Sequence, residues 1–184
     1  MKRLALLATA VVLAGCGGGG GSKTTQTEKP VVLPPSPQQA MKALIEKDPA
    51  LRGTVRTLYQ SANWAVVQSS RRDRATAFAF RLVGGHWVPD RSGKVKLQIL
   101  GPQAGSTTTA SPQVALRFAT ALPSVESALW IDGTELVERG GGSPTRGTIY
   151  GAPVHKLQPG EHVAVGYARS RRHGAAVAWV FSVA

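Results

Sequence analysis

The sequence predicts a mainly β protein: a small α+β part, with one helix and a three-stranded antiparallel sheet, followed by a C-terminal β-sandwich. Short runs of β-branched and aromatic residues alternate with polar ones and end at turn dipeptides such as Gly84-Gly85 and Asp132-Gly133. Apolar residues recur at helical spacing between residues 40 and 60. The predicted parts are a leader (1–15), a tether (16–39), an α+β module (40–92) and a sandwich (93–184).

The first fifteen residues have the parts of an export signal. Lys2 and Arg3 precede an apolar run at 4–14, which is shorter than the roughly 20 residues that a membrane-spanning helix needs. The run ends in LAGC at 13–16, which resembles the lipobox of bacterial lipoproteins at all four positions. The resemblance implies cleavage before Cys16 and a diacylglycerol on its sulfur as the only bound group. It also implies a location on the extracytoplasmic face of the cell membrane.

The alternative for this segment is an ordinary secretory signal followed by a free thiol. Cys16 is the only cysteine in the chain, so it has no partner for an internal disulfide. A lone reactive thiol at the start of an exported protein is a liability, and lipidation removes it.

Residues 16–39 predict an extended spacer. Five glycines follow Cys16, and residues 30–37 include four prolines. A segment of this kind buries too little apolar surface to offset the entropy of ordering it. We expect it to hold the folded part away from the lipid headgroups; the alternative is a Pro-rich ligand for a recognition domain.

The first module, residues 40–92, is predicted to contain a helix from Pro49 to about Gln60, with Asp48 as N-cap. Leu51, Val55 and Leu58 give this segment an apolar stripe at helical spacing. Three strands are predicted to follow, at residues 64–67, 75–83 and 86–89.

The order of these elements, with Trp64-Ala65-Val66-Val67 in one strand and Trp87 after the Gly-Gly turn, resembles a small α+β unit of exported actinobacterial proteins. The resemblance implies no chemistry. Two interpretations of Trp64 and Trp87 remain: a platform for stacking a sugar, or core residues of the small sheet beneath its helix, which we favour.

The second module, residues 93–184, has strands at short, regular spacing with turn signals between them, which is typical of a sandwich. Gly140 to Pro144 is predicted as a long loop. The last two strands, 161–168 and 175–183, are predicted to pair. Val163, Val165 and Tyr167 are expected on one face, opposite core residues of the final strand.

Four segments of this half resemble bacterial immunoglobulin-like (Ig-like) domains: ILGPQAG, ALWIDGTEL, LQPGEHVAVGYA and AAVAWVFSV. The resemblance implies binding, adhesion or spacing without catalysis, and a structural role for His162 at the start of its strand. The sequence departs from these domains at Arg169 to Gly174, where a basic turn replaces a short Asp/Gly/Asn turn.

The chain is strongly basic, with 22 Lys and Arg against 10 Asp and Glu and a net charge of +12. Outside a cell the available polyanions are lipid headgroups, wall polymers and acidic polysaccharides rather than nucleic acid. The alternative is a solvated basic surface without a ligand. Candidate polyanion contacts are Arg169, Arg171, Arg172, Arg71, Arg72 and Arg74.

The sequence contains no recognisable catalytic motif. Cys16 is consumed by the anchor, and none of the histidines has metal-ligand spacing on a predicted helix. Glu126, Glu135 and Glu138 lie near the central hairpin, where we expect them on solvated faces. We therefore expect no enzyme activity, cofactor or metal.

The sequence thus predicts a non-catalytic binding or spacer module of the cell envelope that meets a wall polymer, a polysaccharide or an envelope protein. The alternative is an accessory lipoprotein of a membrane transport or assembly system that binds a small ligand or a metal.

Overall fold

The computed structural model describes residues 35–184. The leader, Cys16 and most of the tether lie outside these residues. The described chain contains α1 (Pro37–Lys47), a short 3₁₀ helix η1 (Pro49–Leu51) and thirteen strands. The strands are β1 (Thr54–Gln60), β2 (Trp64–Arg71), β3 (Arg74–Val83), β4 (His86–Pro89), β5 (Val95–Gly101), β6 (Thr107–Thr108), β7 (Val114–Thr120), β8 (Ser124–Ile131), β9 (Thr134–Glu135), β10 (Arg139–Ser143), β11 (Arg146–Gly151), β12 (Gly160–Ser170) and β13 (Gly174–Val183).

Helix α1 begins at a capping box. The Ser36 hydroxyl accepts from the Gln39 backbone N–H at 3.2 Å, and the Gln39 side chain accepts from the Ser36 N–H at 2.7 Å. Pro37 stands in the first turn, where its missing N–H costs nothing. The end of the predicted tether is therefore helical, and α1 ends at Lys47, before the position at which the predicted helix was expected to begin.

The helix predicted at 49–60 is wrong. Only Pro49–Leu51 is helical, as one 3₁₀ turn, and the rest is strand β1, paired with β2. The ladder is interrupted between Thr57 and Tyr59, so Leu58 is an extra residue in the strand. Val55 packs beneath α1, whereas Leu58 and Tyr59 pack on the opposite face. The apolar stripe comes from a bulged strand with two buried faces.

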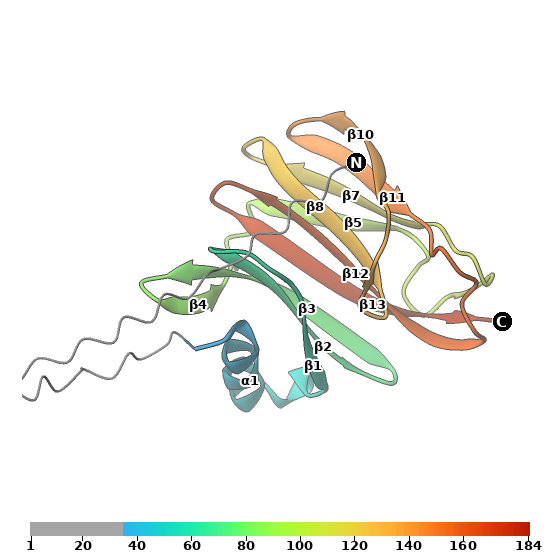
Figure 1. Ribbon diagram of the computed structural model, residues 1–184, viewed down its shortest axis with the longest axis horizontal. Coiled ribbons are helices and arrows are strands. Elements are labelled where there is room, and N and C mark those ends of the chain that lie inside the picture. The colour runs from blue at the N-terminus through green and yellow to red at the C-terminus, as the bar shows by residue number, and fades with distance from the viewer. Residues whose placement is uncertain (1–34) are drawn as a thin grey trace, which may run out of the picture. The chain divides into compact units, whose positions relative to one another are not determined.

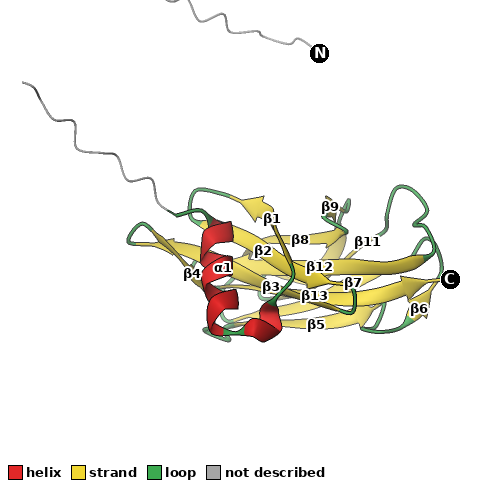
Figure 2. Cartoon of the chain, turned by 90° about the horizontal axis from the view of Figure 1, so that it is seen from below, coloured by secondary structure: helices red, strands yellow, loops and turns green. Residues whose placement is uncertain are grey.

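The first sheet has four strands, in the order β1-β2-β3-β4, rather than three, because β1 joins the predicted hairpins. Gly84 and Gly85 both have positive φ, which confirms the predicted turn between β3 and β4. Helix α1 crosses one face of this sheet (Figure 2). Met41 of α1, 0% exposed, fills a cluster with Val67, Phe80 and Trp87.

The second module is an Ig-like β-sandwich. Its outer sheet has the order β10-β11-β7-β5, and its middle sheet has the order β6-β13-β12-β8-β9. If the strands are lettered in chain order, β5, β7, β10 and β11 are A, B, D and E, and their order in the outer sheet is the A-B-E-D order of an immunoglobulin domain. Strands β8, β12 and β13 correspond to C, F and G. Strand β6 adds a parallel pairing at the edge of β13.

One predicted loop of the sandwich is a strand. Gly140, Gly141 and Gly142 lie in β10, which pairs with β11 at the edge of the outer sheet. The close approach of β11 requires glycine here, because a Cβ on Gly142 would lie 2.4 Å from the Arg146 carbonyl oxygen. The turn between the strands falls instead at Pro144 and Thr145.

The middle sheet is buried on both faces, between the outer sheet and the first sheet (Figure 1). Val165 and Tyr167 were expected to face the sandwich core, but they pack against Trp64 and Val66 of the first sheet. The sandwich side of β12 carries small residues instead. A Cβ on Gly166 would lie 2.7 Å from the Leu116 side chain, so the large residues of neighbouring strands already fill that side.

The described residues, 35–184, belong to one compact unit. Several polar contacts join the modules in addition to the apolar interface, and two of them involve the backbone of the second module. Arg56 donates to the Asp132 carbonyl oxygen at 2.6 Å, and the Gly174 N–H donates to the Asp90 carboxylate at 2.9 Å. Within residues 35–184, no helix is long and apolar enough to cross a membrane.

Candidate functional site

The six candidate arginines fall into two groups at opposite ends of the β12–β13 hairpin. Arg72 lies beside Glu161 at the start of β12, with 3.9 Å between Nε and Oε2, whereas Arg169 is near the end of the same strand. Strand β12 has 11 residues, which at about 3.3 Å per residue separates its ends by about 30 Å. The structure therefore does not bring the six arginines to one surface.

Two of the three arginines in and next to the β2–β3 turn lie close to carboxylates that offset their charge. Arg71 pairs with Asp73 at 3.1 Å, and Arg72 is near Glu161. These side chains are exposed, and exposed ion pairs contribute little stability. Arg74 is exposed at the start of β3. This end of the hairpin thus combines three arginines with two carboxylates.

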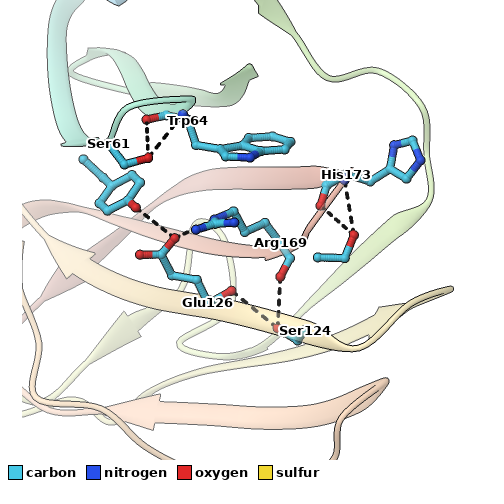
Figure 3. Close-up of polar contacts among 8 residues, drawn as sticks. Ser61, Trp64, Ser124, Glu126, Arg169 and His173 are labelled. Atoms are coloured by element: carbon cyan, nitrogen blue, oxygen red, sulfur yellow. Dashed lines mark hydrogen bonds and ion pairs between the residues drawn. The ribbon is translucent and has the colours of Figure 1, made fainter. Parts of the chain in front are cut away.

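Arg169 is a half-buried residue of the module interface rather than a free surface charge. Its Nε donates to Glu126 Oε2 at 2.6 Å, and the Tyr59 hydroxyl donates to the same oxygen at 2.9 Å. The guanidinium carbon lies 5.9 Å from the centre of the Trp64 ring. Figure 3 shows Arg169 between the indole and the carboxylate.

The electrostatics of Arg169 agree with this geometry. Burial by itself lowers the pKa of its guanidinium, but the hydrogen bond to Glu126 and the surrounding negative charge raise the pKa above its ordinary value. Arg169 therefore stays charged, and its charge is largely neutralised by Glu126. Of the three arginines predicted in this turn, Arg171 and Arg172 are the exposed ones.

A cleft of about 510 Å³ lies beside Arg169, where the two modules meet. Arg81, near the end of β3, contributes a third guanidinium, which is not among the candidates predicted from the sequence. Its Nη1 donates to the Arg172 carbonyl oxygen at 3.1 Å. The residues lining the cleft are Ser61, Ala62, Asn63, Trp64, Arg81, Leu82, Val83, Arg169 and Arg171.

The alternation of residue types along β3 contains a signal that could have identified Arg81 as a surface residue at the edge of the interface. Ala77 and Ala79 point toward the middle sheet, and Arg81 continues the same row with a long charged side chain. Because a charged residue is rarely buried in a sheet interface unless it is paired, the alternation indicates that the row has passed the covered part of the sheet. The sequence does not indicate that this row of residues packs against the middle sheet.

The two tryptophans of the first module are core residues. Trp87, 9% exposed, lies beneath α1 as expected, whereas Trp64, 3% exposed, lies on the opposite face against the middle sheet. Gly174 is close to the Trp64 ring, and a Cβ there would be 2.7 Å from it. Trp64 therefore offers only its rim to the cleft and no open face for stacking a sugar.

His162 holds the turn that follows β8. Its Nδ1 bonds to Asp132 Oδ2 at 2.7 Å and its Nε2 bonds to the Gln158 carbonyl oxygen at 2.8 Å. Both partners are acceptors, so both bonds form together only when both ring nitrogens carry protons, and the two bonds favour the charged imidazole. Burial lowers the pKa of His162, but these two bonds and the Asp132 charge raise it above its ordinary value.

The expected solvated positions of Glu126 and Glu138 are wrong, because both carboxylates are half-buried. Glu126 faces the first sheet, whereas Glu138 accepts from the Ser127 hydroxyl at 3.3 Å on the other face of β8. They form no pair. Burial, helped by the charge of Glu135, raises the pKa of Glu138 to about 7. No group of three His, Cys, Asp or Glu side chains suited to a metal occurs within 35–184.

No protein-family model matches the chain, and no curated protein matches it. Among solved structures, the chain is similar to one in the crystal structure of the titin M10–obscurin-like 1 Ig complex, with 14% identity and a TM-score of 0.32. The similarity covers 49% of this chain and 95% of that chain.

Proposed function

We propose that this protein is a lipid-anchored lipoprotein on the extracytoplasmic face of the cell membrane. The support is in the sequence: a short positively charged start, an apolar run of signal length, and LAGC at 13–16. Two acyl chains contribute about 0.8 kcal/mol per buried methylene, which is enough for stable attachment. A labelled fatty acid fed to producing cells is expected to appear on the protein, and Cys16→Ser is expected to abolish the label. Labelling of the Cys16→Ser protein would contradict the anchor.

The folded part serves as a non-catalytic module that binds an anionic polymer of the envelope. The observation that carries this is the unpaired charge around the β12–β13 turn. Arg81, Arg171 and Arg172 gather there from both modules, and within residues 35–184 none of them forms an ion pair. Exposed, unpaired charges on one end of a basic protein attract a polyanion.

The experiment is a pull-down of the Cys16→Ser protein on isolated cell wall across a salt series. Charge contacts at the surface are screened over about 8 Å at physiological ionic strength, so binding is expected to fall as salt rises. The double variant Arg171→Gln/Arg172→Gln is expected to bind less than the matched Arg71→Gln/Arg72→Gln, whose arginines lie near carboxylates. Absence of binding at low salt, or binding that salt does not weaken, would exclude the proposal.

A further inference from the structure

We propose that the cleft between the modules is a phosphate site: it binds a phosphate group of a wall polymer or lipid headgroup between Arg81 and Arg171. This inference rests on the proposed function. It specifies the chemical group that is bound near the β12–β13 turn. The charged residues lining the cleft are all arginines, with no carboxylate among them. A volume of about 510 Å³ suits a small ligand group rather than a water molecule alone.

Arg81 is held in place before any ligand arrives. Its backbone is central in the first sheet, where it is paired with Trp64 on one side and with Val88 on the other. Its side chain is tied to the Arg172 carbonyl oxygen by one of its five N–H donors. The remaining donors are free to bind an anion, and the planar guanidinium matches two oxygens of a phosphate.

Arg171 supplies a second guanidinium on a long side chain. It lies in the turn between β12 and β13 and is exposed. Asn63, exposed in the loop between β1 and β2, adds a side-chain amide that has no hydrogen-bond partner within residues 35–184. These donors come from three separate segments and line one cleft. Arg169 adds only a screened charge, because Glu126 is bound to it.

The lining also limits what else the cleft recognises. The Trp64 ring is covered, so a neutral sugar has no aromatic face to stack on. Val83, 45% exposed, gives one apolar wall for the carbon atoms next to the anion. The arrangement favours a charged group attached to a short polyol or sugar over an uncharged saccharide.

The first test uses glycerol 3-phosphate as a soluble probe of the Cys16→Ser protein, followed by nuclear magnetic resonance. The side-chain amide of Asn63 and the indole N–H of Trp64 are expected to shift on titration. Arg81→Gln and Arg171→Gln are each expected to weaken binding about tenfold, the effect of losing a charged hydrogen bond. The matched control Arg146→Gln, exposed on the outer sheet, is expected to change binding less than about twofold.

The variant Arg81→Lys tests whether binding depends on the shape of the guanidinium or only on its positive charge. Lysine keeps the charge but lacks the planar fork, so we expect affinity between those of the natural protein and Arg81→Gln. Thermal unfolding of each variant is measured alongside, and a midpoint within about 2 °C of the natural protein confirms that the fold is intact.

Two further arms identify the source of the phosphate. One compares wall before and after hydrofluoric acid, which cleaves phosphodiesters, and the other compares phosphatidylcholine vesicles with and without phosphatidylglycerol. Arg81-dependent binding to untreated wall alone assigns the wall polymer, and such binding to the anionic vesicles alone assigns the headgroup. Equal binding to treated and untreated wall, with none to vesicles, would overturn the phosphate assignment.

Failure of the site and failure of the proposed function give different results. If the natural protein binds wall in a salt-dependent manner while Arg81→Gln and Arg171→Gln bind equally well, the cleft is not the site and the broader proposal stands. If the natural protein binds neither wall nor vesicles at low salt, both fail.

Discussion

Arg169 lies near the end of β12, and its guanidinium links residues from both modules. Glu126 holds it from β8, Trp64 covers it from β2, and Tyr59 shares the same carboxylate. The Arg169 and Glu126 side chains are 21% and 29% exposed, so both are partly removed from water. Loss of one partner leaves the other half-buried and uncompensated.

Arg169→Gln is expected to lower the free energy of unfolding by about 1–3 kcal/mol, less than for a fully buried pair because water still reaches both groups. Urea denaturation at neutral pH measures the change. Arg146→Gln, an exposed arginine on β11, is the control and is expected to change stability by less than about 0.5 kcal/mol. Equal midpoints for the two variants would show that the pair does not stabilise the interface.

Glu138 and His162 make stability depend on pH in the same direction. The folded pKa of each is raised, so each binds its proton more tightly in the folded state than in the unfolded state. The stability contributed by such a group is present below its unfolded pKa and is lost as pH rises through its folded pKa. The window for Glu138 runs from its ordinary 4.5 to about 7. The window for His162 begins at its ordinary 6.5 and lies above it.

We therefore expect the denaturation midpoint to fall as pH rises from 4.5 through neutrality. Glu138→Gln is expected to flatten the lower part of this curve, and His162→Gln the part above pH 6.5. The measurement is a series of urea unfolding curves across pH, with the His162 pKa followed by nuclear magnetic resonance. A rise in stability over this range that both variants retain would contradict the assignment.

At the scale of elements, the alternating pattern predicted most strands but not their faces. In β12, Val165 and Ala164 are both buried, one against the first sheet and one in the sandwich. When both faces of a strand are covered, apolar residues occupy both sets of alternating positions, so the sequence pattern does not distinguish the two faces. The same reason explains β1, where residues serving two faces around the Leu58 bulge imitate a helical stripe.

The candidate site was predicted in part for a related reason. Arg171 and Arg172 belong to a turn that the sequence identifies, whereas Arg81 reaches that turn from 91 residues away. Such a contact depends on how two sheets dock, which local pattern does not encode. Arg169 is in the same basic run, and only its partner Glu126 reveals that it belongs to the interface.

The β12–β13 hairpin packs against Trp64 through a glycine. A Cβ on Gly174 would lie 2.7 Å from the indole and 3.2 Å from the Arg169 Cβ, and the ring is held in a filled core. Gly174→Ala is expected to lower the free energy of unfolding by about 1–3 kcal/mol through overpacking. Thermal or urea unfolding measures it.

The matched control is Gly141→Ala on β10, where no atom lies within 4 Å of the added Cβ and φ is not positive. Alanine there is expected to be neutral or slightly stabilising, because it restricts the unfolded chain. If both substitutions are tolerated equally, the hairpin is not packed as tightly on Trp64 as the distances indicate.

At the scale of the whole folded part, the middle sheet joins the layers into one cooperative structure. Its strands β12 and β13 contribute residues to the sandwich core and to the interface with the first sheet. Separation of the modules would expose Trp130, Val165 and Tyr167, which are at most 2% exposed now. That loss of apolar burial opposes independent unfolding of either module.

We expect residues 35–184 to unfold in one transition. Trp179 lies in the sandwich core and Trp87 beneath α1, so variants in which one of these is the only tryptophan, with the other three replaced by phenylalanine, report on the two ends of the layered structure. Their fluorescence midpoints in urea are expected to coincide. Two separate midpoints would show that the modules unfold independently. A fragment of residues 93–184 is expected to aggregate, because the outer face of its middle sheet is uncovered.

The contact between Arg81 and the Arg172 carbonyl oxygen has a thermodynamic consequence. Because the walls of the cleft come from both modules, a ligand bound there binds the docked form and neither separated half. By mass action such a ligand raises the free energy of unfolding, by about 2.7 kcal/mol when its concentration is a hundred times its dissociation constant. The protein would then be more resistant to heat and proteolysis where its ligand is abundant, and its lifetime would report how much of that ligand surrounds it.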